Sequence, residues 1–368
     1  MWKKSLIKIA ILSSVLMFLI ILLDWSVDPY MKYRKNHSLK YLYEGSTYYD
    51  EERYINPGIA KNISYNTAIV GTSMTENFDI EDVDSLLHVN SIKIPFSGGT
   101  AKELSTMLHY LIAQQKAKTI IYDLDYFAFK GVDESAGAVY TEPPFPNELY
   151  ENDPLSNLKY LSSVRTFMQS LKVLNHTYFG KKHRTFKEVY YWYDVCTFDE
   201  HEVMKLWKKK DSDKLLKLTY NQNEYKFKAL KNNFDRYLLG YIKANPNIKF
   251  VVFLPPYSYL SWKIAQERGS LDSILQFKEH ILRTLVQYQN VEIYDFQQEP
   301  LTFNLDNFKD FFHYSDDINY LMLEKFSSKS DLITQQNLEQ HLLDVQAQRL
   351  KWQSIQPKQC LKLNEDDE

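Results

Sequence analysis

The stretch from Asn66 to Phe78, NTAIVGTSMTENF, decides which class of fold the sequence predicts. Its apolar part, Thr67 to Val70, has the length of a short buried strand and runs straight into the turn GTSM. In open α/β sheets, ligand crevices form at the carboxyl ends of parallel strands. Ser73 therefore lies where a nucleophile is placed in such folds, with a helix start after it to supply backbone donors. The plainer interpretation is that Ser73 is an ordinary helix N-cap.

Outward from this stretch, apolar strands alternate with amphipathic helices. The further strands expected are Val89–Ile94, Thr119–Tyr122, Phe250–Leu254 and Val291–Phe296. A capping box, Thr100 with Glu103, marks the best-specified helix start, and aliphatic and aromatic residues at helical spacing mark further helices over residues 227–241 and 271–285. The alternation predicts an α/β fold with a three-layer α/β/α arrangement and a mostly parallel five-stranded sheet.

The amino terminus predicts a membrane anchor. An uncharged apolar run from Ile9 to Leu23 follows Lys3, Lys4 and Lys8, and no small-residue cleavage site comes after it. We expect a transmembrane helix over residues 9–25. The lysines before the run favour a cytoplasmic end at residues 1–8 and an extracytoplasmic domain, by the positive-inside rule. The alternative is a buried N-terminal core helix.

Three other regions interrupt the regular pattern. Residues 26–65 are polar and rich in tyrosine, and we interpret them as a juxtamembrane connector. Residues 128–220 break the alternation and predict a helical insertion in a domain that spans residues 66–326. Residues 327–368 are polar with scattered leucines and predict a tail with a loosely docked helix.

Composition excludes several classes of function. The formal net charge is −3 over 368 residues, so the whole chain offers no field that favours nucleic acid. The two cysteines, Cys196 and Cys360, are too few for a zinc cage or a disulfide scaffold and leave open one bridge. Phosphate-loop, dinucleotide and paired-histidine zinc motifs are absent from the sequence, so we expect no cofactor and no metal.

The second candidate for chemistry is Asp310-Phe311-Phe312-His313, shortly after the fifth expected strand. A serine hydroxyl is a poor nucleophile until an imidazole takes its proton, and a carboxylate that holds the other ring nitrogen improves that base. Asp310 can do this from the same loop as His313. The spacing alone is weak, but His313 is the one histidine of nine that combines it with this late position and a preceding strand.

A third fragment, Ser97-Gly98-Gly99, follows the second expected strand. Two glycines allow a backbone to approach a ligand closely, so the amides of Gly98 and Gly99 could complete an oxyanion hole. A tight turn between strand and helix explains the same residues equally well.

Together the fragments GTSM, SGG and DFFH resemble the SGNH (GDSL-like) hydrolase superfamily over residues 66–326. The resemblance implies Ser73 as nucleophile, His313 as general base and Asp310 as its orienting carboxylate. It also implies the amides of Ser73 and of Gly98 or Gly99 as oxyanion donors.

The sequence departs from the family in one block. The family's G-x-N-D is absent, and the strand TIIYDLDYF offers Asp123 and Asp125 instead, so Asp125 is a candidate for the oxyanion or substrate-binding position. This loss, together with an anchor, is similar to the membrane-tethered branch of alginate O-acetylation and teichoic-acid D-alanine transfer proteins. The resemblance then implies a cell-surface polymer as substrate and a membrane-bound acyltransferase as partner.

The function expected from the sequence is an extracytoplasmic serine esterase or O-acyltransferase that acts on a surface polysaccharide or teichoic-type polymer. Two alternatives remain open. One is a catalytically degenerate SGNH domain that binds polymer or scaffolds a membrane acyltransferase, and the other is an ordinary secreted esterase on small substrates. The sequence does not decide between hydrolysis and transfer.

Overall fold

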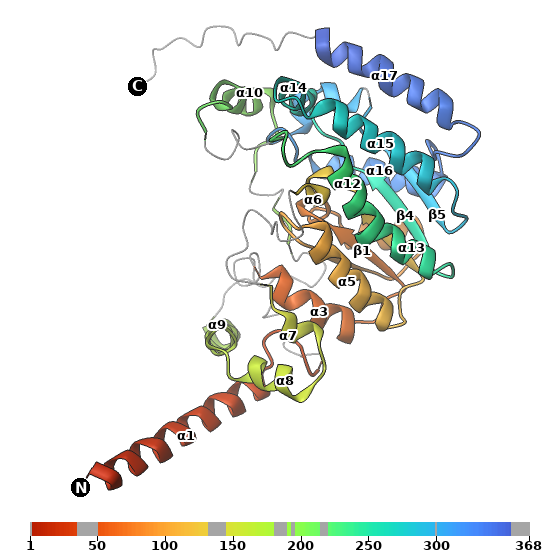
Figure 1. Cartoon of the computed structure of the whole chain (residues 1–368). Coiled ribbons are helices and arrows are strands. Elements are labelled where there is room, and N and C mark those ends of the chain that lie inside the picture. The colour runs from red at the N-terminus through yellow and green to blue at the C-terminus, as the bar shows by residue number, and fades with distance from the viewer. Residues whose placement is uncertain are drawn as a thin grey trace. The chain divides into compact units, whose positions relative to one another are not determined.

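We describe the protein from a computed structural model, drawn in Figure 1. The structure describes residues 2–34, 51–131, 145–179, 190–192, 196–213, 220–298 and 300–354. The chain divides into two compact units. The first, called here the anchor unit, comprises residues 1–65, 106–116 and 141–191, and the second, the sheet unit, comprises residues 66–105, 117–140 and 192–368.

The core of the sheet unit is a parallel sheet of five strands. They are β1 (Thr67–Gly71), β2 (Ser91–Pro95), β3 (Thr119–Asp123), β4 (Lys249–Leu254) and β5 (Val291–Asp295), in the order β2-β1-β3-β4-β5. All four pairings are parallel. The sheet that the sequence predicts is therefore confirmed, with strand bounds within two residues of those expected.

The register places the carboxyl ends of the strands at one rim. Gly71 pairs with Pro95, and Leu254 pairs with Asp295. Every residue of β1 is buried, as expected for a central strand that is covered on both faces. The turn after β1 and the loop after β5, which carry the candidate chemistry, consequently begin at the same rim.

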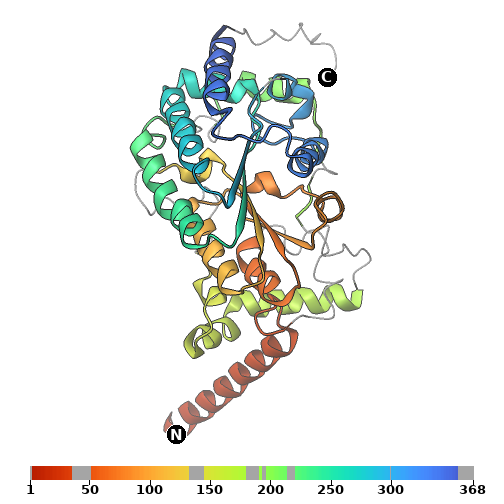
Figure 2. The same ribbon diagram turned by 90° about the vertical axis from the view of Figure 1, so that its right-hand side faces the viewer.

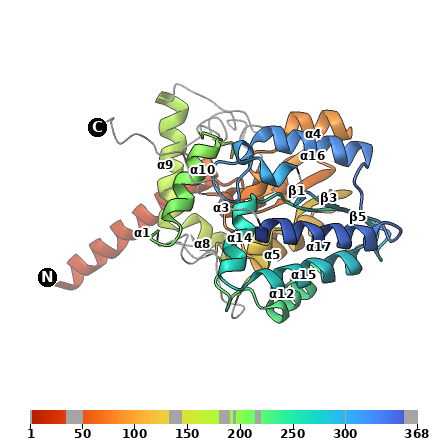
Figure 3. The ribbon, with the colours of Figure 1, turned by 90° about the horizontal axis from the view of Figure 1, so that it is seen from above.

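Helices cover both faces of the sheet. Figures 2 and 3 show α4 (Ile80–Leu87) and α16 (Asp316–Ser328) against one face, and α12 (Phe227–Phe234), α13 (Gly240–Ala244) and α15 (Leu271–Leu285) against the other. The pairs α4 with α16 and α12 with α15 pack together. This arrangement confirms the predicted three-layer fold, in which crossover helices lie on alternate faces of a parallel sheet.

The capping box forms as the sequence predicts. At the start of α5 (Ala101–Ala113), the amide of Thr100 donates to Oε2 of Glu103 at 2.9 Å, and the amide of Glu103 donates back to Oγ1 of Thr100 at 3.3 Å. Two amide groups that a helix start leaves unpaired are satisfied in this way. Residues 101–105 of the helix count with the sheet unit and residues 106–113 with the anchor unit.

The tail contains α17 (Leu338–Ser354), which is docked more firmly than the sequence indicates. Trp352 is 1% exposed, and its ring stacks on that of Trp262, on α14 (Tyr259–Glu267), with centroids 4.6 Å apart. The expectation of a loose helix rested on the polar composition of the tail. That composition conceals one buried aromatic side chain and the polar contacts described next.

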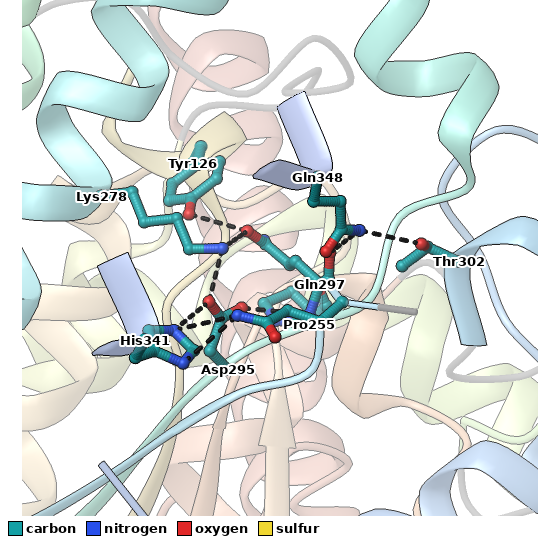
Figure 4. Close-up of polar contacts among 9 residues, drawn as sticks. Tyr126, Pro255, Lys278, Asp295, Gln297, Thr302, His341 and Gln348 are labelled. Carbon is teal, nitrogen blue, oxygen red and sulfur yellow. Dashed lines mark hydrogen bonds and ion pairs between the residues drawn. The ribbon is translucent and has the colours of Figure 1, made fainter. Parts of the chain in front are cut away.

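A buried polar network, called here the β5 network, ties α17 to the end of β5 (Figure 4). Lys278 Nζ lies 2.5 Å from Oδ2 of Asp295 and donates to Oε1 of Gln297 at 3.2 Å. From α17, His341 Nε2 lies 2.9 Å from the same Asp295 oxygen, and Gln348 donates to the carbonyl of Gln297 at 2.9 Å. Burial alone would raise the pKa of Asp295, but Lys278 and His341 outweigh burial and lower it.

The anchor unit contains α1 (Trp2–Val27), α3 (Glu52–Asn62), α7 (Asn147–Tyr150), α8 (Pro154–Leu161) and α9 (Val164–Phe179). Helix α1 is long and apolar enough to cross a membrane, with a mean hydropathy of 2.8 over its best 18-residue window and none of that window buried. At 1.5 Å per residue its 26 residues span roughly 39 Å, more than the roughly 30 Å of a bilayer core.

The turn after α1 is fixed by a buried carboxylate. Asp28 accepts hydrogen bonds from the amides of Lys32, Tyr33 and Arg34 and from the hydroxyl of Tyr160, at 2.9–3.1 Å. The segment that the sequence assigns to an irregular connector thus includes this ordered turn and the helix α3. Pro57 lies inside α3. Because proline is rare in helix interiors, the sequence pattern does not predict a helix there.

The residues expected to form an insertion are divided between the two units. Residues 141–191 count with the anchor unit, whereas residues from Trp192 onward count with the sheet unit and include α10 (Glu200–Lys209). Much of the remainder, including Pro143, Pro144 and Tyr193, lies outside the residues that the structure describes.

Candidate active site

Ser73 follows β1 in a short 3-10 turn, Ser73–Thr75. Thr72, and not Ser73, caps this turn, because Oγ1 of Thr72 accepts from the amide of Met74 at 3.4 Å. The next α-helix, α4, begins later and has its own cap, Asp79, which accepts from the amide of Glu81. The hydroxyl of Ser73 therefore has no capping role and is directed to a different partner.

That partner is His313. Ser73 Oγ lies 2.8 Å from Nε2 of His313, and Nδ1 of the same ring lies 2.7 Å from Oδ2 of Asp310. The second oxygen of Asp310 accepts the amides of Phe312 and His313, each at 2.8 Å. A carboxylate at Nδ1 selects the tautomer with the proton on Nδ1, which leaves Nε2 free to accept the serine proton. The structure thus brings together the three residues proposed as a triad.

The electrostatics of Asp310 suit an orienting carboxylate. Burial would raise its pKa, but the neighbouring His313 ring, the hydrogen bonds from His313 and the charge of Lys309 outweigh burial and lower the pKa to about 2. Asp310 is consequently ionised at any pH near neutrality. An ionised carboxylate at Nδ1 stabilises the imidazolium that forms when His313 takes a proton.

The loop that carries His313 is held against the turn of residues 72–75, called here the nucleophile turn because it carries the candidate nucleophile Ser73. Tyr314 is 3% exposed, and its hydroxyl donates to the carbonyl of Met74 at 2.7 Å. Within the loop, the amide of Lys309 donates to the carbonyl of His313 at 3.0 Å. These contacts fix the distance between nucleophile and base through the backbone. The sequence contains no signal that identifies Tyr314 in this role.

Of the two candidate glycines, Gly98 has the available amide. The amide of Gly99 donates to the carbonyl of Phe96 at 2.7 Å, so it is occupied by the turn. Gly98 has φ +57°, a conformation that glycine adopts without strain. Within the described part of the chain, neither the Gly98 amide nor the Ser73 amide has a hydrogen-bond partner.

The two loops that carry these amides are neighbours. The amide of Phe96 donates to the carbonyl of Gly71 at 2.8 Å, which extends the β1–β2 pairing by one residue into the loops. The geometry is compatible with two backbone donors beside Ser73, and their action on an oxyanion stays a prediction.

Asp125 lies behind the nucleophile turn. Its Oδ2 accepts from Oγ1 of Thr72 at 2.9 Å, and its Oδ1 accepts from the amide of Phe127 at 2.8 Å and from the hydroxyl of Tyr257. Both carboxylate oxygens are therefore engaged, and only 6% of the residue is exposed. Its expected role in oxyanion or substrate binding stays a prediction that this placement does not favour, since Asp125 offers no free donor.

Asp123 faces the same Thr72 hydroxyl. Thr72 Oγ1 lies 3.0 Å from Oδ2 of Asp123 as well as 2.9 Å from Oδ2 of Asp125. One hydroxyl proton cannot point fully at both carboxyl groups, so ionisation of both acids is unfavourable here. Burial, followed by the charge of Asp125, raises the pKa of Asp123 well above its ordinary value. Gly71 makes this placement feasible, because a Cβ there would lie 2.4 Å from Cβ of Asp123.

The ring of Trp192 packs against the ring of His313, the candidate base. Its ring meets the His313 ring edge to face, with centroids 5.5 Å apart and planes at 89°. The indole Nε1 donates to Oε2 of Glu76 at 2.5 Å, and its backbone amide donates to Oδ1 of Asn77 at 3.1 Å. Lys309 Nζ lies 3.5 Å from the centre of the indole. The sequence shows Trp192 only as one of several aromatic residues in the expected insertion.

Within the described ranges, no group of three or more His, Cys, Asp or Glu side chains is arranged to hold a metal ion. A cavity of about 480 Å³ opens elsewhere in the sheet unit, beside Asp295, Phe296 and His341, and its lining does not include Ser73 or His313. The hydrogen bonds that join Ser73, His313 and Asp310 are a geometry compatible with nucleophilic attack by a serine.

Comparison with known proteins adds little to this geometry. No family model matches the chain, and no curated protein matches it. Among solved structures, a protein of Bacteroides fragilis described as a "putative acylhydrolase" is similar with a TM-score of 0.32 and 11% sequence identity, over 75% of this chain and 88% of that chain.

Proposed function

We propose that the protein is an extracytoplasmic serine esterase or O-acyltransferase that acts on acyl groups of a cell-surface polysaccharide or teichoic-type polymer. The observation that carries the proposal is the continuous chain of hydrogen bonds from Ser73 Oγ through His313 to Asp310, with links of 2.8 and 2.7 Å. Nucleophile, base and orienting acid within hydrogen-bond reach of one another are the signature of an activated serine.

In the first half of the reaction, Ser73 Oγ attacks the acyl carbonyl carbon while its proton passes to Nε2 of His313. The negative charge that develops on the carbonyl oxygen is met by the amides of Ser73 and Gly98. The tetrahedral intermediate then collapses, the bond to the donor oxygen or sulfur breaks, and His313 returns the proton to the departing alcohol or thiol. The acyl group remains as an ester on Ser73.

In the second half, an acceptor hydroxyl enters the same position. His313 removes its proton, the acceptor oxygen attacks the ester carbon, and Ser73 leaves with the proton that His313 returns. A sugar or polyol hydroxyl gives O-acyl transfer, and water gives hydrolysis. The same residues perform both reactions, so the outcome depends on which acceptor occupies the site.

The proposed location follows from α1, whose length and hydropathy allow it to cross a membrane. A tethered enzyme of this kind acts on polymer at the outer surface of that membrane. A membrane-bound acyltransferase that supplies activated acyl groups is the partner we propose, and nucleic acid is not a proposed ligand.

A fluorophosphonate probe tests the nucleophile. The purified full chain is expected to react at Ser73, and Ser73→Ala is expected to abolish labelling. Ser85→Ala, which changes an exposed serine on α4, is the matched control and is expected to label fully. Well-folded wild type that does not label would contradict the enzymatic proposal and favour the scaffold alternative.

A second assay separates the substrate classes. Turnover of p-nitrophenyl acetate is compared with loss or gain of acetyl groups on isolated surface polysaccharide. Action on the polymer supports the proposal, whereas rapid turnover of the small ester with no change in the polymer indicates an ordinary esterase.

A further inference from the structure

Helix α9 of the anchor unit has its polarity reversed. The side chains that it buries are mostly polar, and those that it exposes are mostly apolar. The buried residues include Thr166, Gln169 and Ser170, which are at most 2% exposed. The exposed residues include Val164 (78%), Met168 (51%), Leu171 (41%), Tyr178 (74%) and Phe179 (77%). A surface helix of a protein in water normally shows the opposite pattern, so the outer face of α9 is adapted to an apolar surrounding.

The preceding helix repeats the pattern. In α8, Leu155 and Leu158 are 75% and 51% exposed, whereas Ser156 and Tyr160 are buried. The buried hydroxyls are hydrogen-bonded: Ser156 Oγ donates to Glu151 at 2.8 Å, and the hydroxyl of Tyr160 donates to Asp28 at 2.9 Å. We call the exposed apolar side chains of the two helices the α8–α9 apolar face. It consists of Leu155, Leu158, Val164, Met168, Leu171, Tyr178 and Phe179.

This face adjoins the carboxyl end of α1. Both α8 and α9 pack on α1, and Figures 1 and 2 show α9 crossing near the end of α1. Ser170 Oγ donates to Oδ1 of Asp24 at 2.7 Å, and Asp24 is fully buried. The polar inner side of α9 thereby covers a carboxyl group that terminates the apolar stretch of α1. Without that cover, the carboxyl group would face the apolar surrounding of the helix.

The contact between α9 and α1 lies at the end of α1, among side chains that are typical of a membrane surface. Trp25 is 49% exposed on the last turn of α1, and the guanidinium of Arg34 lies 4.8 Å from the centre of its ring. Tryptophan and basic side chains are enriched where the hydrocarbon of a bilayer ends. Lys172 is exposed on α9 beside Leu171, where its ammonium group can reach lipid phosphates.

We propose that the α8–α9 apolar face lies in the membrane–water interface on the extracytoplasmic side of the membrane that α1 crosses. Helix α9 then lies parallel to the bilayer plane and makes a second membrane contact besides α1. The occupant is lipid because α8 and α9 pack directly on α1, none of whose apolar window is covered by protein. The inference rests on α1 spanning the membrane and is independent of the chemistry at Ser73. An amphipathic helix in this position inserts its apolar side chains among headgroups and upper acyl chains.

Site-directed spin labelling of the full chain tests the proposal. Cys196 and Cys360 are first replaced by serine, and single cysteines at Met168, Leu171 and Tyr178 are then labelled with a nitroxide. The protein is reconstituted in nanodiscs of palmitoyl-oleoyl phosphatidylglycerol and phosphatidylethanolamine. Labels at Leu343 and Leu350, exposed apolar residues on α17 of the sheet unit, are the controls. Far-UV circular dichroism checks that each labelled protein is folded.

The expected result is contact with lipid at α9 alone. We expect labels on α9 to collide with water-soluble nickel reagent roughly threefold less often than the α17 labels, and with oxygen more often, as for side chains within the interface. Equal access of the nickel reagent at both helices overturns the proposal. Protection of the α9 labels from both nickel and oxygen also overturns it, because that result shows burial against protein, either a second copy or another chain.

A variant supplies an independent check. Val164→Ser, Met168→Ser and Leu171→Ser are combined in the protein labelled at Tyr178. Because the replaced side chains are exposed, the thermal unfolding midpoint in detergent is expected to change little, while the label moves outward and meets more nickel reagent. Unchanged protection at Tyr178 would show that the apolar side chains do not hold α9 at the membrane.

Discussion

At the scale of single residues, the hydroxyl of Thr72 determines the state of its neighbours. It lies within 3.0 Å of carboxyl oxygens from both Asp123 and Asp125, in the turn directly before Ser73. Burial raises the pKa of both acids, and ionisation of both at once is unfavourable because their carboxyl groups face one hydroxyl proton. Buried pairs of acids behave in this way when they share one site.

The replacement Asp310→Asn tests the orienting carboxylate. We expect kcat/KM for ester turnover to fall on the order of 10²–10⁴-fold, because an amide does not stabilise the imidazolium and can hold the wrong tautomer. Since the pKa of Asp310 is about 2, Asp310 itself does not titrate between pH 5 and pH 9 and adds no pH dependence of its own in that range. Asp331→Asn, which removes an exposed carboxylate 2.9 Å from Lys325, is the control. A loss of less than threefold contradicts the triad.

The replacement Asp123→Asn tests the buried proton. The pKa of Asp123 is raised in the folded state, so above its unfolded pKa of about 3.9 the native protein binds a proton that the unfolded chain releases. Stability of the wild type should therefore decline as the pH rises from about 4 toward the raised pKa. The amide of the variant cannot titrate. We therefore expect the thermal unfolding midpoint of the variant to rise relative to that of the wild type as the pH increases from 5 to 8. A constant difference between the two proteins would show that Asp123 is ionised.

Local pattern was sufficient to find three residues of the candidate site and not the others. Ser73, Asp310 and His313 lie in short motifs whose spacing follows from the chemistry. Trp192 and Tyr314 act through contacts with residues 115–240 positions away, at Asn77 and Met74, and no local pattern encodes such contacts. Asp125 was a candidate by position in its strand, but the direction of its side chain depends on Thr72 and Tyr257, which only the folded chain brings near it.

At the scale of elements, the β5 network holds β5, α15 and α17 together. Lys278 and Asp295 are both at most 1% exposed in their side chains. Lys278→Met leaves the Asp295 charge buried with the His341 ring as its remaining side-chain hydrogen-bond partner, and we expect the free energy of unfolding to fall by about 3–5 kcal/mol. The measurement is chemical unfolding of the full chain in detergent.

The double variant Lys278→Met, Asp295→Leu distinguishes charge from packing. It removes both charges, and we expect it to regain a large part of the stability lost by the single variant. Arg283→Met, on the same helix and in an exposed ion pair with Glu339, should leave stability nearly unchanged. A double variant less stable than the single one would show that packing around Lys278, rather than the unpaired charge, accounts for the loss.

Helices and strands were predictable where burial produces a regular spacing of apolar residues. The five strands are short, apolar and bounded by turn residues, and α5 carries a complete capping box, so pattern alone located them. Helix α3 was missed because Pro57 conceals it. The helix expected over residues 227–241 contains a π-helical segment, Asp235–Leu239, between α12 and α13, and hydrophobic spacing does not reveal such a change of winding.

At the scale of the whole molecule, the side of the membrane on which the sheet unit lies can be measured with Cys196. This thiol is free and partly exposed, and in a Cys360→Ser background it is the only one in the chain. We expect a membrane-impermeant maleimide to label it in intact cells, because the lysines before the apolar run favour a cytoplasmic amino terminus. Labelling only after lysis would place the sheet unit in the cytoplasm and exclude action on surface polymer. Adding Cys196→Ser to the Cys360→Ser protein measures the nonspecific labelling.

The division into two units was beyond prediction from the sequence. The anchor unit takes three separate stretches of chain, residues 1–65, 106–116 and 141–191. Within it, Lys116 Nζ donates to the carbonyls of Ala60, Lys61 and Ile63 at 2.6–3.1 Å, which shows how a short middle stretch is joined to the first. A linear reading assigns such stretches to a connector, a helix and an insertion, because composition carries no record of which stretches later meet.

The order of synthesis gives this discontinuity a consequence. Asp28, which organises the turn after α1, receives its hydrogen bond from Tyr160, 132 residues further along the chain. At translation rates of about 5–20 residues per second, the ribosome needs on the order of ten seconds to deliver that partner. Over this interval the carboxylate of Asp28 lacks the partner that α8 later provides. The nascent chain is then open to degradation or to chaperone binding until α8 has been synthesised.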